Sequence, residues 1–262
     1  MRTSALRASD KQIRGWPHPL QIKGVIIVNK LLDLFCCAGG CSEGYRRAGF
    51  TPYGIDIKHQ PHYPFPFLQM DALEAMDILL KGGSLTFSNG ETLSLNDFAA
   101  FHASPPCQHA STIAKQNRVM RPGKYNHPNM IPDIRPRLVQ TGKPYVIENV
   151  KTSSLINPGK LTGSWFGLDV KRDRYFECSF PMFDTPLCGW QTPRFRSLDQ
   201  RRKGKLSAVV GVHGHIKYHG EGEIRAKAMG INWMVDSELV QAIPPAYTEY
   251  IGKYLLKAII ES

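Results

Sequence analysis

Short, nearly continuous apolar runs recur along the chain and predict buried strands. They occupy residues 25–28, 31–35, 51–57, 98–103 and 143–150. A strand with one exposed face shows alternating polar and apolar residues, whereas a strand of a parallel sheet is covered on both faces and is apolar throughout. The pattern therefore favours an α/β fold with a mixed, mostly parallel sheet and helices on both faces.

Segments with helical spacing lie between and after these runs. Residues 42–48 and 71–81 have the spacing of short helices, and Gly49, just past the first, is a common helix stop. Residues 237–256 return to helical spacing after two prolines, so we expect the last helix to pack on the first domain. Residues 111–137 are rich in Pro, Asn, Arg and Lys with little periodicity, which predicts a long loop.

The turn after the second apolar run is rich in small residues. It reads CCAGG (residues 36–40), and the next helix begins at the glycines. Such a helix start suits phosphates, dinucleotides or simply a tight turn. Asp56 ends the following strand, where its carboxylate can accept hydrogen bonds from both hydroxyls of a ribose. The unit predicts a nucleoside-cofactor half-fold, in which Asp71 either faces an adenine amino group or caps its helix.

The composition limits the partners and the compartment. Lys and Arg number 33 against 22 Asp and Glu, a formal charge of +11, which favours a polyanion such as nucleic acid or an anionic membrane surface. No apolar run is long enough to span a bilayer, so no membrane insertion is expected. Six cysteines in 262 residues do not make the framework of a small secreted domain, so a reducing cytoplasm is expected. The cysteine spacing matches no zinc site, and no metal is expected.

Changes in composition also divide the chain. Residues 1–24 are predicted to form a basic N-terminal arm, and residues 25–179 the α/β domain. Residues 180–233 change to short β-like pieces, turns and basic clusters, which predicts a small second lobe. Residues 234–262 are expected to carry the final helix back to the first domain, in a protein that acts as a monomer.

Cys107 follows an apolar strand in the run SPPCQ, where two prolines end the strand and turn the chain. A thiol at the end of a strand is a candidate nucleophile, but on its own a buried core cysteine is the better interpretation. Glu148, Arg172 and Arg174 are equally ambiguous in isolation. Taken alone, Glu148 is interpreted as a surface acid at the end of a strand. The two arginines, taken alone, are interpreted as part of a solvated face or as a phosphate clamp.

Taken together and in order, these segments resemble the motifs of the DNA (cytosine-5) methyltransferases, most closely the short members encoded by bacteriophages. The resemblance covers residues 31–178 and 236–256. An ordered set of motifs is far more specific than any one of them. In chain order they are DLFCCAGGCSEGYRRAGF (33–50) for the cofactor, SPPCQ (104–108) for the nucleophile, ENV (148–150) for the acid, RDR (172–174) for the arginines and QAIPP (241–245) for the last cofactor motif.

The resemblance implies a Rossmann-like, S-adenosylmethionine-dependent methyltransferase fold, with residues 180–233 as the target-recognition lobe. It implies that the thiolate of Cys107 attacks C6 of a flipped cytosine in DNA, so that C5 takes a methyl group. It also implies that Glu148 donates or shares a proton at N3 of the cytosine ring and that Arg174 hydrogen-bonds O2. Arg172 is expected to help hold the thiolate or Glu148. The alternatives are a tRNA cytosine-5 methyltransferase and a non-catalytic DNA-binding relative.

The resemblance implies further site residues. Among the positions that depart from the family pattern, Cys37 stands where Gly is usual, beside the cofactor, and Gln241 where Asn is usual. S-adenosylmethionine, which becomes S-adenosylhomocysteine, is expected to contact Phe35, Cys36, Ala38, Gly39, Gly40, Asp56, Ile57, Asp71, Ala72, Pro105, Gln241, Ala242 and Ile243. Double-stranded DNA is expected to contact Gln108, Ser111, Arg194, Arg196, Arg201 and Arg202.

Overall fold

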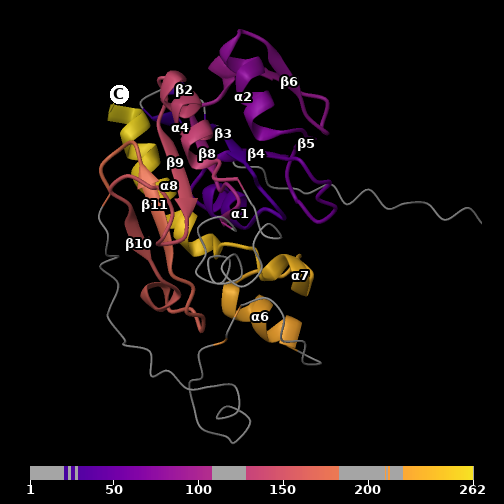
Figure 1. The fold of residues 1–262 in the computed structure, drawn as a ribbon, viewed down its shortest axis with the longest axis vertical. Coiled ribbons are helices and arrows are strands. Elements are labelled where there is room, and N and C mark those ends of the chain that lie inside the picture. Colours follow the sequence, from indigo (N-terminus) through magenta and orange to yellow (C-terminus); the bar gives the residue numbers. More distant parts are fainter. Residues whose placement is uncertain are drawn as a thin grey trace, which may run out of the picture.

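A seven-stranded sheet forms the centre of the molecule (Figure 1). One strand, β11, runs against the others, because both of its pairings are antiparallel. In spatial order the strands are β10 (Gly159–Leu161), β11 (Arg174–Cys178), β9 (Tyr145–Asn149), β8 (Ala100–Ala103), β3 (Lys30–Leu34), β4 (Thr51–Asp56) and β5 (Phe67–Gln69). The computed structural model describes residues 21–22, 25–26, 29–107, 128–182, 210, 212 and 221–261.

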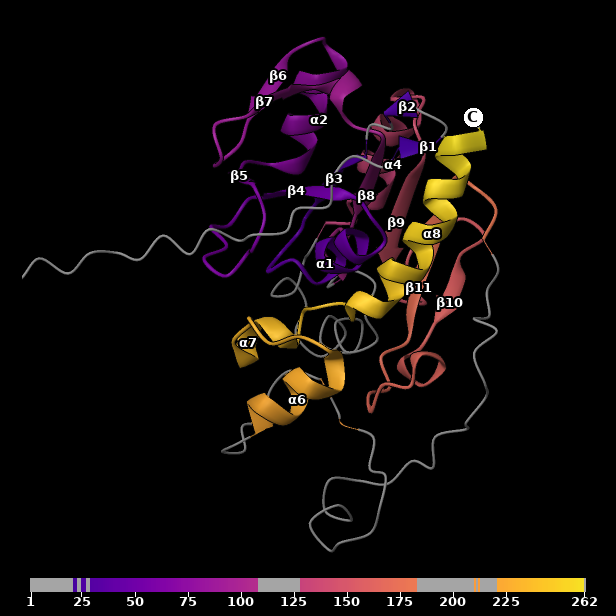
Figure 2. The same ribbon diagram turned by 180° about the vertical axis from the view of Figure 1, so that it is seen from behind.

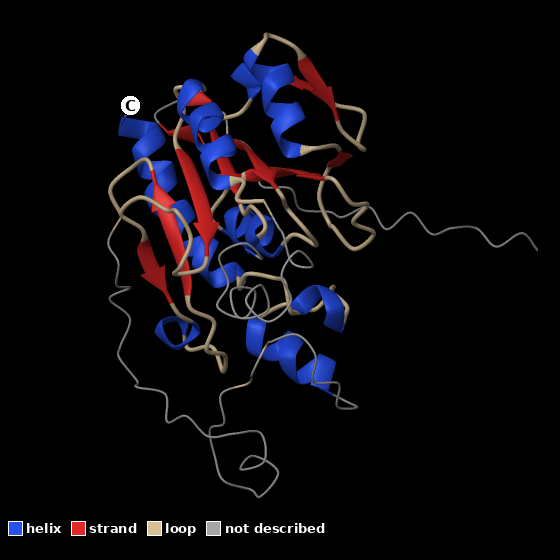
Figure 3. Ribbon diagram, in the orientation of Figure 1, coloured by secondary structure: helices blue, strands red, loops and turns tan. Residues whose placement is uncertain are grey.

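Helices cover both faces of this sheet, as the secondary-structure view makes clear (Figure 3). On one face, α2 (Ala72–Leu80) and α4 (Ile131–Gln140) share a buried cluster with Leu32 and Leu34 of β3. On the other, α1 (Gly40–Arg47) and α8 (Pro245–Glu261) share a cluster with Leu31 (Figure 2). Because alternate residues of β3 enter opposite clusters, the strand is apolar on both sides, which confirms the predicted fold class.

The order of the strands reverses at β3. The chain passes from β3 to β4 on one side of it and later returns to pair β8 on the other side. At such a reversal the loops that leave the two central strands diverge to opposite faces, and a crevice opens at the carboxyl ends of the strands. The residues that follow β3 and β8 therefore lie at the edge of the sheet where ligands bind in this class of fold.

Glycines allow α1 and α8 to pack in close contact. A Cβ atom added at Gly44 would lie 2.0 Å from Oγ1 of Thr248 and 2.1 Å from the carbonyl oxygen of Pro245. A Cβ added at Gly252 would lie 2.5 Å from that of Ala48. The close approach also lets the Thr248 hydroxyl donate to the carbonyl of Cys41 at 2.8 Å. The last helix is therefore fixed directly to the helix that follows the Gly-rich turn.

A third, smaller cluster lies against the Gly-rich turn. The helices α6 (Glu221–Met229) and α7 (Asp236–Leu239) contribute Met229 and Leu239, which are buried together with Ala38 and Val212. The indole Nε1 of Trp233, between the two helices, donates to the carbonyl of Ala38 at 2.8 Å. Residues near the C-terminal end of the chain thus cover the turn that follows the first sheet strand.

Two of the predicted segments differ from the structure. Residues 131–137 belong to α4 and not to a loop, because Ile131, Ile134 and Leu138 form a buried helical face. The prolines in this segment hid the pattern, although Pro is tolerated in the first turn of a helix, where its missing N–H has no partner to lose. Helix α6 stands where short β-like pieces were predicted in residues 180–233. The proposed domain boundaries stay a prediction.

The remaining described elements are small. Two hairpins stand apart from the main sheet: β1 (Gln21–Ile22) with β2 (Val25–Ile26), and β6 (Ser84–Thr86) with β7 (Thr92–Ser94). Short 3-10 turns occupy Leu95–Asp97 and Gly163–Phe166. Of the helices in the described part of the chain, none has the length and apolar character needed to cross a membrane.

Candidate active site

The turn after β3 has an unusual backbone. Phe35 and Cys37 have positive φ angles of 60° and 46°, a region that residues with a side chain rarely adopt, and Gly39 follows at 86°. The amide of Cys36 donates to Ile55 of β4 at 3.1 Å, and its carbonyl accepts from the amide of Gly39 at 3.0 Å. The structure thus brings the predicted cofactor residues of this turn into one tight loop that opens on α1.

The last cofactor motif lies against the same turn. A Cβ atom added at Gly40 would lie 2.5 Å from the carbonyl oxygen of Ile243, so the two backbones are in direct contact. Ala242 and Ile243 are buried, and Gln241 precedes them at the end of α7. Ala242 and Ile243 are therefore neighbours of the Gly-rich turn, although some 200 positions separate them in the chain, because α8 packs on α1.

Both carboxylate oxygens of Asp56 accept hydrogen bonds from main-chain amides, one of them in the turn. Oδ2 accepts from the amide of Cys37 at 3.0 Å, and Oδ1 accepts from the amide of Lys58 at 2.9 Å. A carboxylate has about four acceptor positions, so two are left for the hydroxyls of a ribose. The adjacent Ile57 side chain is 63% exposed, the largest exposed fraction among the large apolar side chains of the described residues. An acid beside an uncovered apolar side chain fits an adenosine.

Asp71 caps α2, which is one of the two roles left open by its sequence. Its Oδ1 accepts from the amides of Leu73 at 2.9 Å and Glu74 at 3.1 Å. Ala72, the first residue of the helix, is buried. Capping uses one carboxylate oxygen of Asp71, and the contact with an adenine amino group stays a prediction.

The loop after β8 is anchored before it reaches Cys107. The amide of Ser104 donates to Leu34 of β3 at 3.1 Å, and the carbonyl of Pro105 accepts from Nδ2 of Asn149 at 2.8 Å. Cys107 itself is half-buried. Burial and the charge of Glu148 raise the pKa of its thiol, while Arg174 and Arg172 act in the opposite direction. The side chain of Cys107 is therefore held as a thiol, with two guanidinium groups nearby.

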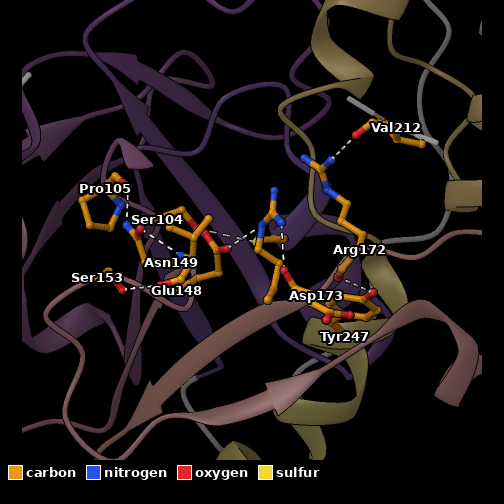
Figure 4. Close-up of polar contacts among 12 residues, drawn as sticks. Ser104, Pro105, Glu148, Asn149, Ser153, Arg172, Asp173, Val212 and Tyr247 are labelled. Carbon is orange, nitrogen blue, oxygen red and sulfur yellow. Dashed lines mark hydrogen bonds and ion pairs between the residues drawn. The ribbon is translucent and has the colours of Figure 1, made fainter. Parts of the chain in front are cut away.

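Glu148 is the penultimate residue of β9 and pairs with Arg174, the first residue of β11. Its Oε1 lies 3.0 Å from Nε of Arg174, and Glu148 is only 6% exposed. Burial raises the pKa of Glu148, against the opposing effects of Arg174, Arg172 and a hydrogen bond from Ser104. Figure 4 shows Ser104, Pro105, Glu148 and Asn149 gathered at this end of the sheet. An acid whose pKa is raised by burial, beside a guanidinium, suits the binding of a polar ring edge.

Arg172 points away from this pair, toward the third cluster (Figure 4). Its Nη1 donates to the carbonyl of Val212 at 2.9 Å, and its Nη2 donates to Val240 at 2.8 Å. The Tyr247 hydroxyl donates to the carbonyl of Arg172 at 2.8 Å. Burial and the nearby Arg174 lower the pKa of Arg172 to about 9. Its charge still acts on both Cys107 and Glu148, and the role predicted for Arg172, to help hold the thiolate or Glu148, stays a prediction.

Solved structures of several methyltransferases share the fold of this chain. A putative DNA modification methyltransferase encoded within an E. coli prophage is 15% identical, with a TM-score of 0.51 over 89% of this chain and 99% of that one. The chain has a methyltransferase fold. A mutant of DNMT2 from Spodoptera frugiperda is 14% identical, with a TM-score of 0.51 over 87% and 99%. Dnmt2 from S. pombe is 13% identical, with a TM-score of 0.50 over 88% and 98%.

The shared fold confirms the architecture implied by the sequence motifs. No family model matches the sequence, and neither does any curated protein. At identities of 13–15% the likeness establishes the fold, so the chemistry has to be argued from the residues themselves. The chain spans almost the whole length of these methyltransferases, and its β3–β8 crevice is the place to look for that chemistry.

Sequence reasoning missed several polar residues of this methyltransferase fold. Asn149 lies within the ENV motif and fixes the loop of Cys107, so its position in the motif was a usable signal. Tyr45 lies within the motif of residues 33–50 and His102 outside any motif, but nothing in the sequence pairs them, because they are 57 positions apart and contact each other only in the folded chain. His102 in turn contacts Ser104, which is bonded to Glu148.

The predicted DNA contacts lie outside the part of the chain that the structure describes. This holds for Gln108, Ser111, Arg194, Arg196, Arg201 and Arg202. Within the described residues, no group of three or more His, Cys, Asp or Glu side chains is arranged to hold a metal ion.

Proposed function

We propose that this protein methylates C5 of cytosine in DNA, with S-adenosylmethionine as the methyl donor. One observation carries the proposal: the Cys107 loop and the Glu148–Arg174 pair meet beside the Gly-rich turn at the carboxyl ends of neighbouring strands. A thiol, an acid and a guanidinium around one crevice are the groups that activation of a pyrimidine ring requires.

The Gly-rich turn, Asp56 and Ile57 fit the adenosine end of the methyl donor. Asp56 has acceptor positions free for ribose hydroxyls, and Ile57 offers an uncovered apolar face to a purine. When bound, S-adenosylmethionine supplies an electrophilic methyl group on a sulfonium centre. The chain's own task is to hold that group beside the ring and to make the ring carbon nucleophilic.

Cys107 supplies the nucleophile. Its Sγ loses a proton and forms a bond to C6 of cytosine, and the electrons of the C5–C6 double bond become available at C5. C5 then takes the methyl group, whose bond electrons stay on the donor sulfur. Removal of the C5 proton by a base restores the double bond and expels the Cys107 thiolate. We assign this base to no residue.

Glu148 and Arg174 stabilise the charge that enters the ring. Addition of the thiolate places negative charge on N3 and O2, which a proton shared with Glu148 and a hydrogen bond from Arg174 offset. The raised pKa of Glu148 suits it to hold this proton. Because C6 is covered in a stacked duplex, the cytosine has to leave the helix to reach Cys107.

The choice of DNA over RNA rests on the motif order and on the formal charge of +11, and the charge alone suits either polyanion. Methyl transfer from labelled S-adenosylmethionine to duplex DNA and to tRNA separates the two. Incorporation into tRNA alone would replace the proposed substrate by the RNA alternative.

A mechanism-based trap tests the covalent step. Incubation with S-adenosylmethionine and duplex DNA that contains 5-fluorocytosine should give a complex stable to denaturing gels, because fluorine does not leave as a proton does. Cys107→Ser should lose this complex and still bind the methyl donor. A wild-type protein that traps no DNA of varied sequence would contradict the proposal, and trapping by Cys107→Ser would contradict the assigned nucleophile.

A further inference from the structure

A line of buried polar side chains leads from α1 to Glu148. The Tyr45 hydroxyl lies 2.9 Å from Nδ1 of His102, and Nε2 of His102 lies 2.8 Å from the Ser104 hydroxyl. Ser104 is in turn hydrogen-bonded to Glu148. Tyr45 and His102 are fully buried. Tyr45 and Ser104 lie within the motif segments 33–50 and 104–108, but the resemblance assigns no role to them or to His102.

The number of protons available fixes the direction of these hydrogen bonds. Burial lowers the pKa of His102 to about 3, so the ring is neutral and carries one N–H. If Nδ1 carried it, the buried Tyr45 hydroxyl would have no acceptor in the described contacts, an arrangement that folded proteins avoid. Tyr45 therefore donates to Nδ1, and Nε2–H donates to Ser104.

This direction leaves the Ser104 hydroxyl with its proton free for Glu148. Ser104 already accepts from His102, so it acts as a donor to the carboxylate. A weak contact between Ser104 and the Cys41 thiol, 3.9 Å apart, does not compete with a carboxylate for this proton. The relay thus favours the ionised form of Glu148, against the effect of burial, and it does so without adding a charge to the site.

We propose that Tyr45 and His102 are positioning residues, which fix Ser104 as a hydrogen-bond donor and thereby set the orientation and the proton affinity of Glu148. The proposal deepens the proposed methyl transfer and rests on it for its catalytic meaning. The arrangement of the relay itself is a property of the folded chain and can be tested without turnover.

Other groups also act on Glu148 and have to be considered in any pH experiment. Arg174 and Arg172 favour its ionised form. The remaining titratable groups that interact with it are Asp33, Cys37, Cys41 and Cys107. All six are unchanged in the variants below, so a shift between variants reports the relay.

The first experiment follows the Glu148 carboxyl directly. In protein labelled with δ-¹³C glutamate, the Glu148 resonance is the one absent from Glu148→Gln, and its chemical shift is followed against pH. Ser104→Ala removes the donor, so the pKa of Glu148 should rise. Tyr45→Phe removes the hydroxyl that fixes the His102 tautomer, so the pKa of Glu148 should rise by less than in Ser104→Ala. In the Ser104→Ala background, Tyr45→Phe should add no further shift.

Two controls accompany it. Ser104→Thr keeps a hydroxyl and should restore the wild-type titration. Tyr53→Phe removes a buried tyrosine hydroxyl that bonds Glu91, outside the relay, and should leave the Glu148 titration unchanged. Equal titrations in wild type and Ser104→Ala, or additive shifts for Tyr45→Phe and Ser104→Ala, would overturn the relay.

The second experiment follows methyl transfer. Protonated Glu148 is the form required at N3, so the rate falls as pH rises through its pKa, and a raised pKa moves this fall to higher pH. Ser104→Ala should show this shift, together with a fall of about tenfold in the kcat of the low-pH plateau, where Glu148 is fully protonated, because the carboxyl is no longer held in its orientation; KM for DNA should be nearly unchanged. A shifted NMR titration with no methyl transfer even in wild type would retain the relay and reject the proposed function. A rate loss without any shift in the profile would assign these residues a merely structural role.

Discussion

At the scale of single residues, the charges around Cys107 act in opposite directions. Burial and ionised Glu148 raise the pKa of its thiol, and the two arginines lower it. Glu148 itself is drawn toward its protonated form by burial. Protonation of Glu148 therefore removes the charge that opposes the thiolate, so the acid and the nucleophile become active together.

Replacement of Glu148 by Gln should separate these two effects. The neutral amide no longer raises the pKa of Cys107, so the thiolate fraction at neutral pH rises and alkylation by iodoacetamide becomes faster. Methyl transfer should fall by about 100-fold or more, because the proton at N3 has no source. Slower alkylation in Glu148→Gln would contradict this electrostatic account, and Cys107→Ser identifies which alkylation belongs to Cys107.

A second residue-scale prediction concerns Cys37, whose φ of 46° is unfavourable for a residue with a side chain. The left-handed region costs such a residue about 1–2 kcal/mol, and glycine costs about 0.5–1 kcal/mol in lost freedom, so Cys37→Gly should stabilise the fold by up to about 1 kcal/mol. Urea unfolding measures this. Cys37→Ala keeps the Cβ atom and should give no gain, and equal gains in both variants would show that the thiol rather than the backbone is responsible.

At the scale of elements, the site depends on how α1 and α8 approach each other. Gly44 contacts Thr248 and Pro245 in a space with no room for a methyl group. The same packing holds Ala242 and Ile243 against the Gly-rich turn. A change between these helices therefore acts on the cofactor turn without touching a residue of the crevice.

Gly44→Ala should consequently destabilise the protein by about 1–3 kcal/mol, the usual effect of overpacking. Gly222 on α6 offers a matched control, because a Cβ there would have its nearest neighbour at an ordinary 3.8 Å. Gly222→Ala should be neutral or stabilising by about 0.5–1 kcal/mol, since alanine is the better helix former. The free energies of unfolding in urea test both, and a Gly44→Ala protein as stable as wild type would refute the packing argument.

At the scale of the whole molecule, one crevice collects residues from most of the chain. The strand order reverses between β3 and β8, and the loops after these strands carry the Gly-rich turn and Cys107. The next strand, β9, adds Glu148, and the antiparallel β11 brings Arg174 back to the same edge. A strand that runs the other way presents its first residue where its neighbours present their last, so the RDR motif has to lead into β11, with Arg174 as its first residue, to reach the site.

Much of this was predictable, because the signals are local. The apolar run of β3 predicted a strand covered on both faces, and the motifs around Cys107 and Glu148 predicted their place at strand ends. Helix α4 was missed because Pro132 and Pro136 masked the spacing of its buried face. The target of Arg172 was also beyond prediction, since Val212 and Val240 offer only main-chain carbonyls, which have no sequence signature.

The sequence by itself determined the order of strands and helices, the cofactor turn with Asp56, and the identity of the candidate nucleophile and acid. The elements and the turn follow from residue types and short-range spacing, which fix backbone preference and burial locally. The candidate nucleophile and acid were implied by the ordered motifs that resemble those of the methyltransferases. Only the tertiary structure decided that Glu148 pairs with Arg174, that Arg172 binds main-chain carbonyls, and that a relay through His102 reaches Glu148. Hydrogen bonds of this kind require the distance between two side chains, far apart in the chain, to be right within a few tenths of an ångström. Tertiary packing sets that distance, and the local sequence pattern does not.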